Sequence, residues 1–148
     1  MAQVRRAQAQ WHGDLFGGQG TVKAATSGAV PGLPVTWHAR AEAADTGMTS
    51  PEELLAAAHA SCFAMACSNQ LAKAGHPAER LDVTVDVHAD KTAAGWTVMT
   101  SRITVRGKVP GATAESFLAA AEGAKDGCPI SRAIAGNVTI ELDAALEG

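Results

Sequence analysis

The segment SPEELLAAAHASCFAMAC, residues 50–67, constrains the fold of this chain more than any other stretch. Ser50 suits the N-cap of a helix, Pro51 suits its first position, and Glu53 stands where a capping box places an acidic residue. The sequence therefore predicts a helix from Pro51 to about Ala74. Its middle is apolar on nearly every side, so we expect this helix to be buried on more than one face.

The remaining segments predict strands and a second helix within one domain spanning residues 1–148. Strands that are segregated from two helices, with few βαβ units, favour an α+β fold with largely antiparallel sheets. The predicted elements are short strands and hairpin turns over residues 1–45, a strand over 81–89, a strand over 96–109 with a bulge near Thr100, a helix over 113–126 and a strand over 138–144.

Composition excludes several classes of function. The net charge is −3 and only 18% of the residues are charged, without a basic run that could follow a phosphate backbone. The longest apolar stretch is too short to cross a bilayer, and the first residues lack the apolar core of a leader peptide. We therefore expect a cytoplasmic protein that binds neither nucleic acid nor membranes.

The histidines do not predict a metal site. They show no ligand-pair spacing, and the chain has no CxxC motif, so we expect no metal and no other cofactor. The five are His12, His38, His59, His76 and His88.

The three cysteines differ in their predicted surroundings. Cys62 and Cys67 lie five residues apart on one helix, a spacing that forbids a disulfide between them unless the helix unwinds. Apolar neighbours favour an inert, buried thiol at Cys67 and would raise the pKa of Cys62 as well. Cys128 precedes Pro129 and is predicted at the N-terminus of a short helix, where free N–H groups stabilise a thiolate. On these grounds Cys128 is either a helix cap before Pro129 or the first candidate for a nucleophile, and a disulfide with Cys62 is permitted.

The two glutamates at the start of the helix have different predicted roles. Glu53 is predicted to bond within the helix cap, so the carboxylate of Glu52 is available for another interaction. Glu52 either complements the helix N-terminus or pairs with an arginine, and Arg40 in TWHARAEA is the favoured partner.

These residues resemble the OsmC/Ohr family of osmotically inducible and organic hydroperoxide resistance proteins. The resemblance rests on SPEELLAAAHASCF, on GCPISRAI about sixty-five residues later, and on QWHGDLFGGQGTV, WHAR and VTVDV. AHASCF and WHAR are more similar to the OsmC branch than to the Ohr branch. The family fold implied is an intertwined homodimer.

The resemblance implies roles for four residues. Cys62 matches the peroxidatic cysteine and Cys128 the resolving one, which reverses the order suggested by the helix terminus. Glu52 matches the family glutamate, and Arg40 matches the arginine near the thiol, although Arg5 or Arg6 could take its place. The implied activity is reduction of organic hydroperoxides, and less efficiently of hydrogen peroxide, with a dihydrolipoyl-type dithiol as reductant and no cofactor.

Helix geometry adds a constraint on the site. Ten residues separate Glu52 from Cys62, which corresponds to about 15 Å along a continuous helix. We therefore expect two chains to pack their central helices together, so that Glu52 and Arg40 complete the site of the partner chain.

Two alternative functions follow from the same residues. His59 stands three residues before Cys62, and a Cys–His pair could support acyl hydrolysis. The cysteines could also be packing residues of a non-catalytic module that binds a small apolar ligand.

Overall fold

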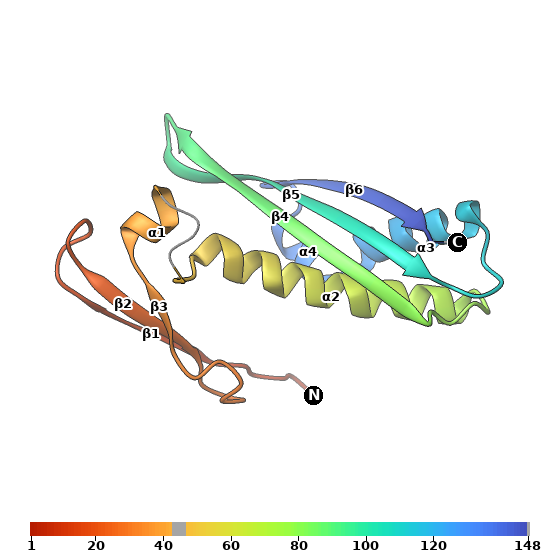
Figure 1. Cartoon of the computed structure of the whole chain (residues 1–148), viewed down its shortest axis with the longest axis horizontal. Coiled ribbons are helices and arrows are strands. Elements are labelled where there is room, and N and C mark those ends of the chain that lie inside the picture. The colour runs from red at the N-terminus through yellow and green to blue at the C-terminus, as the bar shows by residue number, and fades with distance from the viewer. Residues whose placement is uncertain (43–46, 148) are drawn as a thin grey trace. The chain divides into compact units, whose positions relative to one another are not determined.

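The computed structural model describes residues 1–42 and 47–147, and Figure 1 shows its ribbon. These residues gather into two compact units, Met1–Leu54 and Leu55–Gly148. Each unit contains one three-stranded sheet, as expected for an α+β chain. The predicted region of short strands extended to residue 45, and its last three positions lie outside the described residues.

The first unit is an antiparallel sheet followed by a short helix. The strand order is β1-β2-β3, so the predicted strands and hairpins are present. The short helix was not predicted; the Thr36 hydroxyl caps it by accepting a hydrogen bond from the Ala39 N–H at 3.1 Å. The elements are β1 (Ala7–His12), β2 (Gln19–Ala24), β3 (Leu33–Val35) and α1 (Trp37–Ala41).

The second unit packs helices on one face of a mixed sheet. The long helix α2 begins in the first unit and continues through the second, within one residue of its predicted bounds. The elements are α2 (Pro51–Lys73), β4 (Arg80–Thr92), β5 (Gly95–Lys108), α3 (Ala114–Gly127), α4 (Pro129–Ile134) and β6 (Thr139–Leu146).

The β4–β5 hairpin contains the bulge that the sequence predicted. His88 pairs with Thr100 and Ala89 pairs with Val98, so Met99 is the extra residue of β5. The sheet continues with β6, which runs parallel to β5. The prediction of a largely antiparallel sheet did not include this pair, which arises because α3 and α4 form a crossover between the two strands.

The core of the second unit lies between α2, α3 and one face of the sheet. Residues of β5 alternate between buried and accessible, with Ile103 and Val105 pointing inward. Phe117 of α3 is fully buried against them. Helix α2 contributes one buried residue per turn, at His59, Phe63, Cys67 and Leu71.

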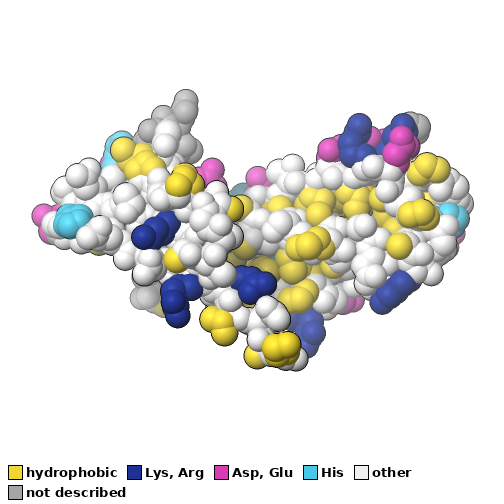
Figure 2. All heavy atoms as spheres, turned by 90° about the horizontal axis from the view of Figure 1, so that it is seen from below, with side chains coloured by type: hydrophobic (Ala, Val, Ile, Leu, Met, Phe, Trp, Pro, Cys, Tyr) yellow, Lys and Arg dark blue, Asp and Glu magenta, His cyan; other side chains and the backbone are white. Residues whose placement is uncertain are grey.

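The opposite face of α2 is open in the single chain. Met65 on this face is 69% exposed, and Figure 2 shows hydrophobic side chains gathered on the face that α2 presents. A groove of about 630 Å³ follows the C-terminal half of α2, lined by Ala64, Met65, Ala72 and Leu81 among others. The expected burial on more than one face is therefore not achieved within one chain. None of the described helices has the length and apolar character needed to cross a bilayer.

Candidate active site

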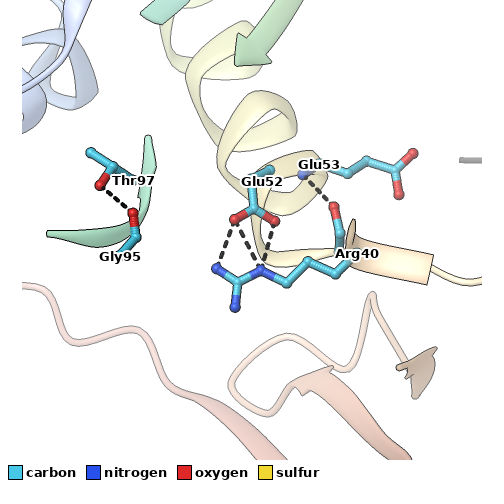
Figure 3. A network of polar contacts seen from close by, with 6 residues as sticks. Arg40, Glu52, Glu53, Gly95 and Thr97 are labelled. Carbon is cyan, nitrogen blue, oxygen red and sulfur yellow. Dashed lines mark hydrogen bonds and ion pairs between the residues drawn. The ribbon is translucent and has the colours of Figure 1, made fainter. Parts of the chain in front are cut away.

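Arg40 and Glu52 form a bidentate ion pair within the first unit. Arg40 Nη2 lies 2.8 Å from Glu52 Oε1, and Arg40 Nε lies 3.1 and 3.2 Å from the two carboxylate oxygens. Figure 3 shows the guanidinium facing the carboxylate on the first turn of α2, together with a separate Thr97–Gly95 hydrogen bond at the start of β5. The Glu52 side chain is 12% exposed and that of Arg40 is 30% exposed. The structure thus brings together the two residues that the sequence suggested as partners.

Arg40 also borders an aromatic cavity in the first unit. Its guanidinium carbon lies 5.8 Å from the ring centroid of Trp37, within the range of a cation–π interaction. Phe16 packs edge-on against Trp37, with 6.0 Å between ring centroids. The cavity has a volume of about 360 Å³ and is lined by Trp11, Leu15, Val35, Thr36, Trp37, Arg40 and Pro51. The Arg40 guanidinium therefore lies at the edge of a largely apolar cavity.

Glu53 serves the start of α2. Its backbone N–H donates to the Ser50 hydroxyl at 3.1 Å, as expected of an N-cap. Its carboxylate accepts a hydrogen bond from the Thr49 hydroxyl at 2.6 Å. Glu53 is thus committed to the helix start, and Glu52 is the glutamate that binds an arginine.

Cys62 and Cys128 meet in the second unit. Cys62 lies on α2. Cys128 is the N-cap of α4 and Pro129 is the first residue of that helix, as the sequence predicted. Cys62 packs against the core cluster that contains Cys128, and the two thiols are close enough for each to change the pKa of the other. Both thiols are free and Cys128 is fully buried. Neighbouring thiols on two helices are candidates for a disulfide.

The two thiols have opposite pKa shifts. Burial raises the pKa of Cys62, and the contact with Cys128 raises it further. Burial also opposes ionisation of Cys128, but the backbone N–H of Ser131 and the contact with Cys62 lower its pKa below the usual value. The lowered pKa of Cys128 agrees with its position at the N-terminus of α4.

His59 connects three elements behind the thiols. Its ring is fully buried; Nδ1 lies 2.8 Å from the Ser101 hydroxyl of β5, and Nε2 lies 2.8 Å from the Ser131 hydroxyl of α4. Burial lowers the pKa of His59, so the ring is neutral. Because both nitrogens already bond to hydroxyls, neither is available to activate Cys62 as an acyl hydrolase would require.

Cys67 is remote from this chemistry. It is fully buried in the core, where burial raises its pKa to about 11. Across the described positions, no three or more of His, Cys, Asp and Glu gather in an arrangement that could hold a metal ion.

The sequence did not identify Ser101 or Ser131 as part of this region. Ser131 carried a weak signal, because it stands at the third position of the short helix predicted after Cys128. Ser101 carried none, since an inward-facing serine on a strand cannot be told from a packing residue without knowing its neighbour.

The chain is similar to known proteins over nearly its whole length. The OsmC-like protein family matches residues 44–143. Peroxiredoxin OsmC of Escherichia coli (strain K12) is 38% identical over 137 residues, which cover 93% of this chain and 94% of that protein. Peroxiredoxin OsmC of Shigella flexneri matches to the same extent.

Solved structures share the fold. An organic hydroperoxide resistance protein from Elizabethkingia anophelis has a TM-score of 0.78 and 24% identity, covering 99% of this chain and all of that chain. An organic hydroperoxide resistance protein OsmC from Legionella pneumophila has a TM-score of 0.72 and 24% identity, covering 97% of this chain and 99% of that chain. The family match and the 38% identity together show that this chain belongs to the OsmC-like protein family.

Proposed function

We propose that this protein is a thiol-dependent peroxidase that reduces organic hydroperoxides to alcohols with Cys62 and Cys128 as its redox pair. The observation that carries this proposal is the proximity of Cys62, which packs against the core of the second unit, to Cys128 at the N-terminus of α4, where each thiol shifts the pKa of the other. The similarity to Peroxiredoxin OsmC of Escherichia coli supports a peroxidase. In such a protein the pair would serve as an antioxidant during oxidative stress.

The proposed reaction has two steps. The Cys62 sulfur attacks the terminal peroxide oxygen, the O–O bond breaks, and the alkoxide leaves and is protonated to an alcohol. Cys62 is thereby oxidised to a sulfenic acid. The Cys128 sulfur then displaces the sulfenic hydroxyl, which leaves as water, and an intramolecular disulfide forms. A dithiol of the dihydrolipoyl type would return the disulfide to two thiols in the cytoplasm.

Among the described residues, the groups that shift the pKa of Cys62 include no positively charged side chain, and attack by this sulfur would be favoured by one. Burial raises the pKa of this thiol, so a nearby guanidinium would have to favour its ionisation. Arg40, oriented by the bidentate bond to Glu52, is the proposed source. The same guanidinium would stabilise the negative charge that develops on the leaving oxygen.

A homodimer would bring this charge to the thiol. Helix α2 runs unbroken from Pro51 to Lys73, so the ten residues from Glu52 to Cys62 span about 15 Å of its length. Its open apolar face, which includes the exposed Met65, would be covered by the α2 helix of a second chain. In that arrangement Arg40 of the partner subunit would serve Cys62.

The aromatic cavity supports an organic substrate. It lies beside Arg40 and is walled by Trp11, Leu15 and Trp37. An alkyl tail would bury apolar surface there while its peroxide group stayed near the guanidinium. Hydrogen peroxide has no such tail, so organic hydroperoxides would be the better substrates.

The test is peroxide consumption by cysteine variants. Wild type and Cys67→Ala are expected to consume cumene hydroperoxide with a dithiol reductant, and faster than hydrogen peroxide. Cys62→Ser is expected to lose turnover, and Cys128→Ser is expected to stop after one turnover with a sulfenic acid that a dimedone probe labels. Full turnover by Cys62→Ser would refute the proposal, and failure of Cys128→Ser to form a sulfenate with peroxide would favour a non-catalytic binding module.

A further inference from the structure

The short helix α4 is attached to α2 by a buried polar bridge. His59 Nδ1 lies 2.8 Å from the Ser101 hydroxyl of β5, and His59 Nε2 lies 2.8 Å from the Ser131 hydroxyl of α4. All three side chains are buried, with exposures of 0% for Ser101 and His59 and 2% for Ser131. The bridge therefore joins three elements in the interior of the second unit, and the reaction proposed above uses none of its members.

Ser131 is the residue of α4 that enters the core. Among the six residues of this helix, all of which the structure describes, Ser131 is the buried one. A helix of this length is not stable by itself, and Cys128 at its N-cap makes no side-chain capping bond. The position of α4, and with it that of Cys128, therefore depends on tertiary contacts, namely the apolar packing of Ile130 and the directional bond of Ser131.

The bridge and the two cysteines occupy matching positions on the same two segments. Cys62 follows His59 by three residues on α2, and Cys128 precedes Ser131 by three residues at the start of α4. Residues three apart share a face of a helix and lie about 4.5 Å apart along its axis. One turn forward on α2 and one turn back on α4 thus lead from the hydrogen-bonded pair to the cysteine pair. Cys62 packs against the core cluster that contains Cys128, in agreement with this spacing.

We infer that His59 and Ser131 are positioning residues for disulfide formation, because their bond holds α4 at the register that keeps Cys128 beside Cys62. The place of this step in a reaction rests on the proposed function. His59 acts through Ser131, and Ser131 acts through the backbone of α4, so neither side chain exchanges a proton or electrons with the sulfurs. Ser101 fixes the orientation of the imidazole through its bond to Nδ1.

The step that depends on this register is the reaction of the Cys62 sulfenic acid with the Cys128 thiol. A bond forms between the two sulfurs while the S–O bond of the sulfenic acid breaks, and the hydroxyl leaves with the thiol proton as water. The sulfenic sulfur is reduced and the Cys128 sulfur is oxidised. A disulfide requires Cβ carbons about 3.5–4.5 Å apart, so a small displacement of α4 would slow this step and leave the attack on the peroxide unchanged.

Loss of either bridge partner leaves a buried polar group without a bond. A neutral imidazole donates from one nitrogen and accepts at the other, so it satisfies both serine hydroxyls at once. His59→Leu would leave these two hydroxyls without a partner in the core, and the Ser131 hydroxyl would reach water only if α4 moved away from α2. His59→Gln keeps one donor and one acceptor group on the side chain and is the conservative variant.

The test measures the equilibrium of the Cys62–Cys128 disulfide in glutathione redox buffers, without peroxide and in a Cys67→Ala background. The fraction of oxidised protein gives the effective concentration of one thiol toward the other. Ser131→Ala and His59→Leu are each expected to lower this effective concentration by about tenfold. The double variant is expected to lose no more than either single variant, because both remove the same bond. His59→Gln is expected to stay within about threefold of the background protein.

A core variant separates positioning from general stability. Val85→Ala removes buried apolar volume from β4 in the same unit, so it should lower the free energy of unfolding without changing the effective concentration. Urea unfolding measures the stability of each reduced variant, and near-ultraviolet circular dichroism verifies its fold; if Ser131→Ala does not fold, the His59 pair decides. Unchanged effective concentrations in Ser131→Ala and His59→Leu, or an equal loss in Val85→Ala, would overturn the inference.

Peroxide experiments distinguish this inference from the proposed function. With an organic hydroperoxide, the dimedone-reactive sulfenate is expected to last about tenfold longer in His59→Leu than in the wild type and to form at the same rate. A disulfide that weakens in the bridge variants of a protein that consumes no peroxide would support the inference and refute the peroxidase. Peroxide turnover with equal sulfenate lifetimes in wild type and His59→Leu would refute the inference alone.

Discussion

The Arg40 guanidinium holds both oxygens of the Glu52 carboxylate, with Nη2 2.8 Å from Oε1 and Nε within 3.2 Å of each oxygen. Two parallel bonds fix the plane of the guanidinium as well as its position. This pair joins α1 to the first turn of α2, and it fixes the orientation of the positively charged guanidinium.

Variants of Arg40 should show whether the reaction depends on the positive charge at this position or also on the orientation of the guanidinium. Arg40→Met is expected to lower kcat/KM for an organic hydroperoxide by about 100-fold, because an electrostatic stabiliser of the leaving oxygen is lost. Arg40→Lys keeps the charge but cannot make the bidentate bond, so an intermediate loss is expected. Glu52→Gln should resemble Arg40→Lys. Unchanged kcat/KM in folded Arg40→Met would show that this arginine does not assist the reaction.

The open face of α2 predicts association through Met65. Sedimentation of the wild type should give the mass of two chains, and Met65→Glu should give one chain with a reduced kcat/KM, because a charge would be buried in the interface. Leu118→Glu is the matched control, since Leu118 is an exposed apolar residue of α3. A fully active single chain would contradict the shared site.

Burial of His59 predicts a pH-dependent stability. Its pKa is lowered in the folded chain, so the unfolded chain binds more protons below about pH 6.5. The free energy of unfolding should therefore fall as pH decreases through this value, by up to about 1.4 kcal/mol per pH unit. Denaturant titrations at pH 7 and pH 5.5 measure it. His59→Gln should flatten the slope, and His88→Gln, at an exposed position of β4, serves as the control. Equal slopes in wild type and His59→Gln would contradict this account.

Gly107 of β5 packs directly against Phe117 of α3. A Cβ atom at this position would contact Phe117 Cε2 and lie 2.6 Å from its Cζ atom, and the ring is fully buried. Gly107→Ala should therefore lower the free energy of unfolding by about 1–3 kcal/mol. Gly123→Ala on α3 meets only the end of Gln70 at 3.4 Å and should stabilise the helix by up to about 1 kcal/mol. Thermal unfolding compares the two, and a loss in both would show that α3 itself tolerates no added methyl group.

Local sequence signals determined most of the elements. The cap at Ser50 and Pro51 defined the start of α2, and Pro129 defined α4 with Cys128 at its N-terminus. The change of apolar phase in β5 predicted a bulge near Thr100, and the structure has it at Met99. Each of these depends on a few adjacent residues, so the sequence alone contains the information. The motifs around Cys62 and Cys128 likewise sufficed to suggest the family.

Only the tertiary structure decided which distant groups meet. It paired β6 with β5 in parallel, joined Arg40 to Glu52 across twelve residues, and enclosed His59 between Ser101 and Ser131. The pKa shifts of the two thiols belong to the same class, because each responds to a sulfur on another helix that no local pattern relates to it. Periodicity and capping report on neighbours along the chain, whereas pKa values respond to neighbours in space.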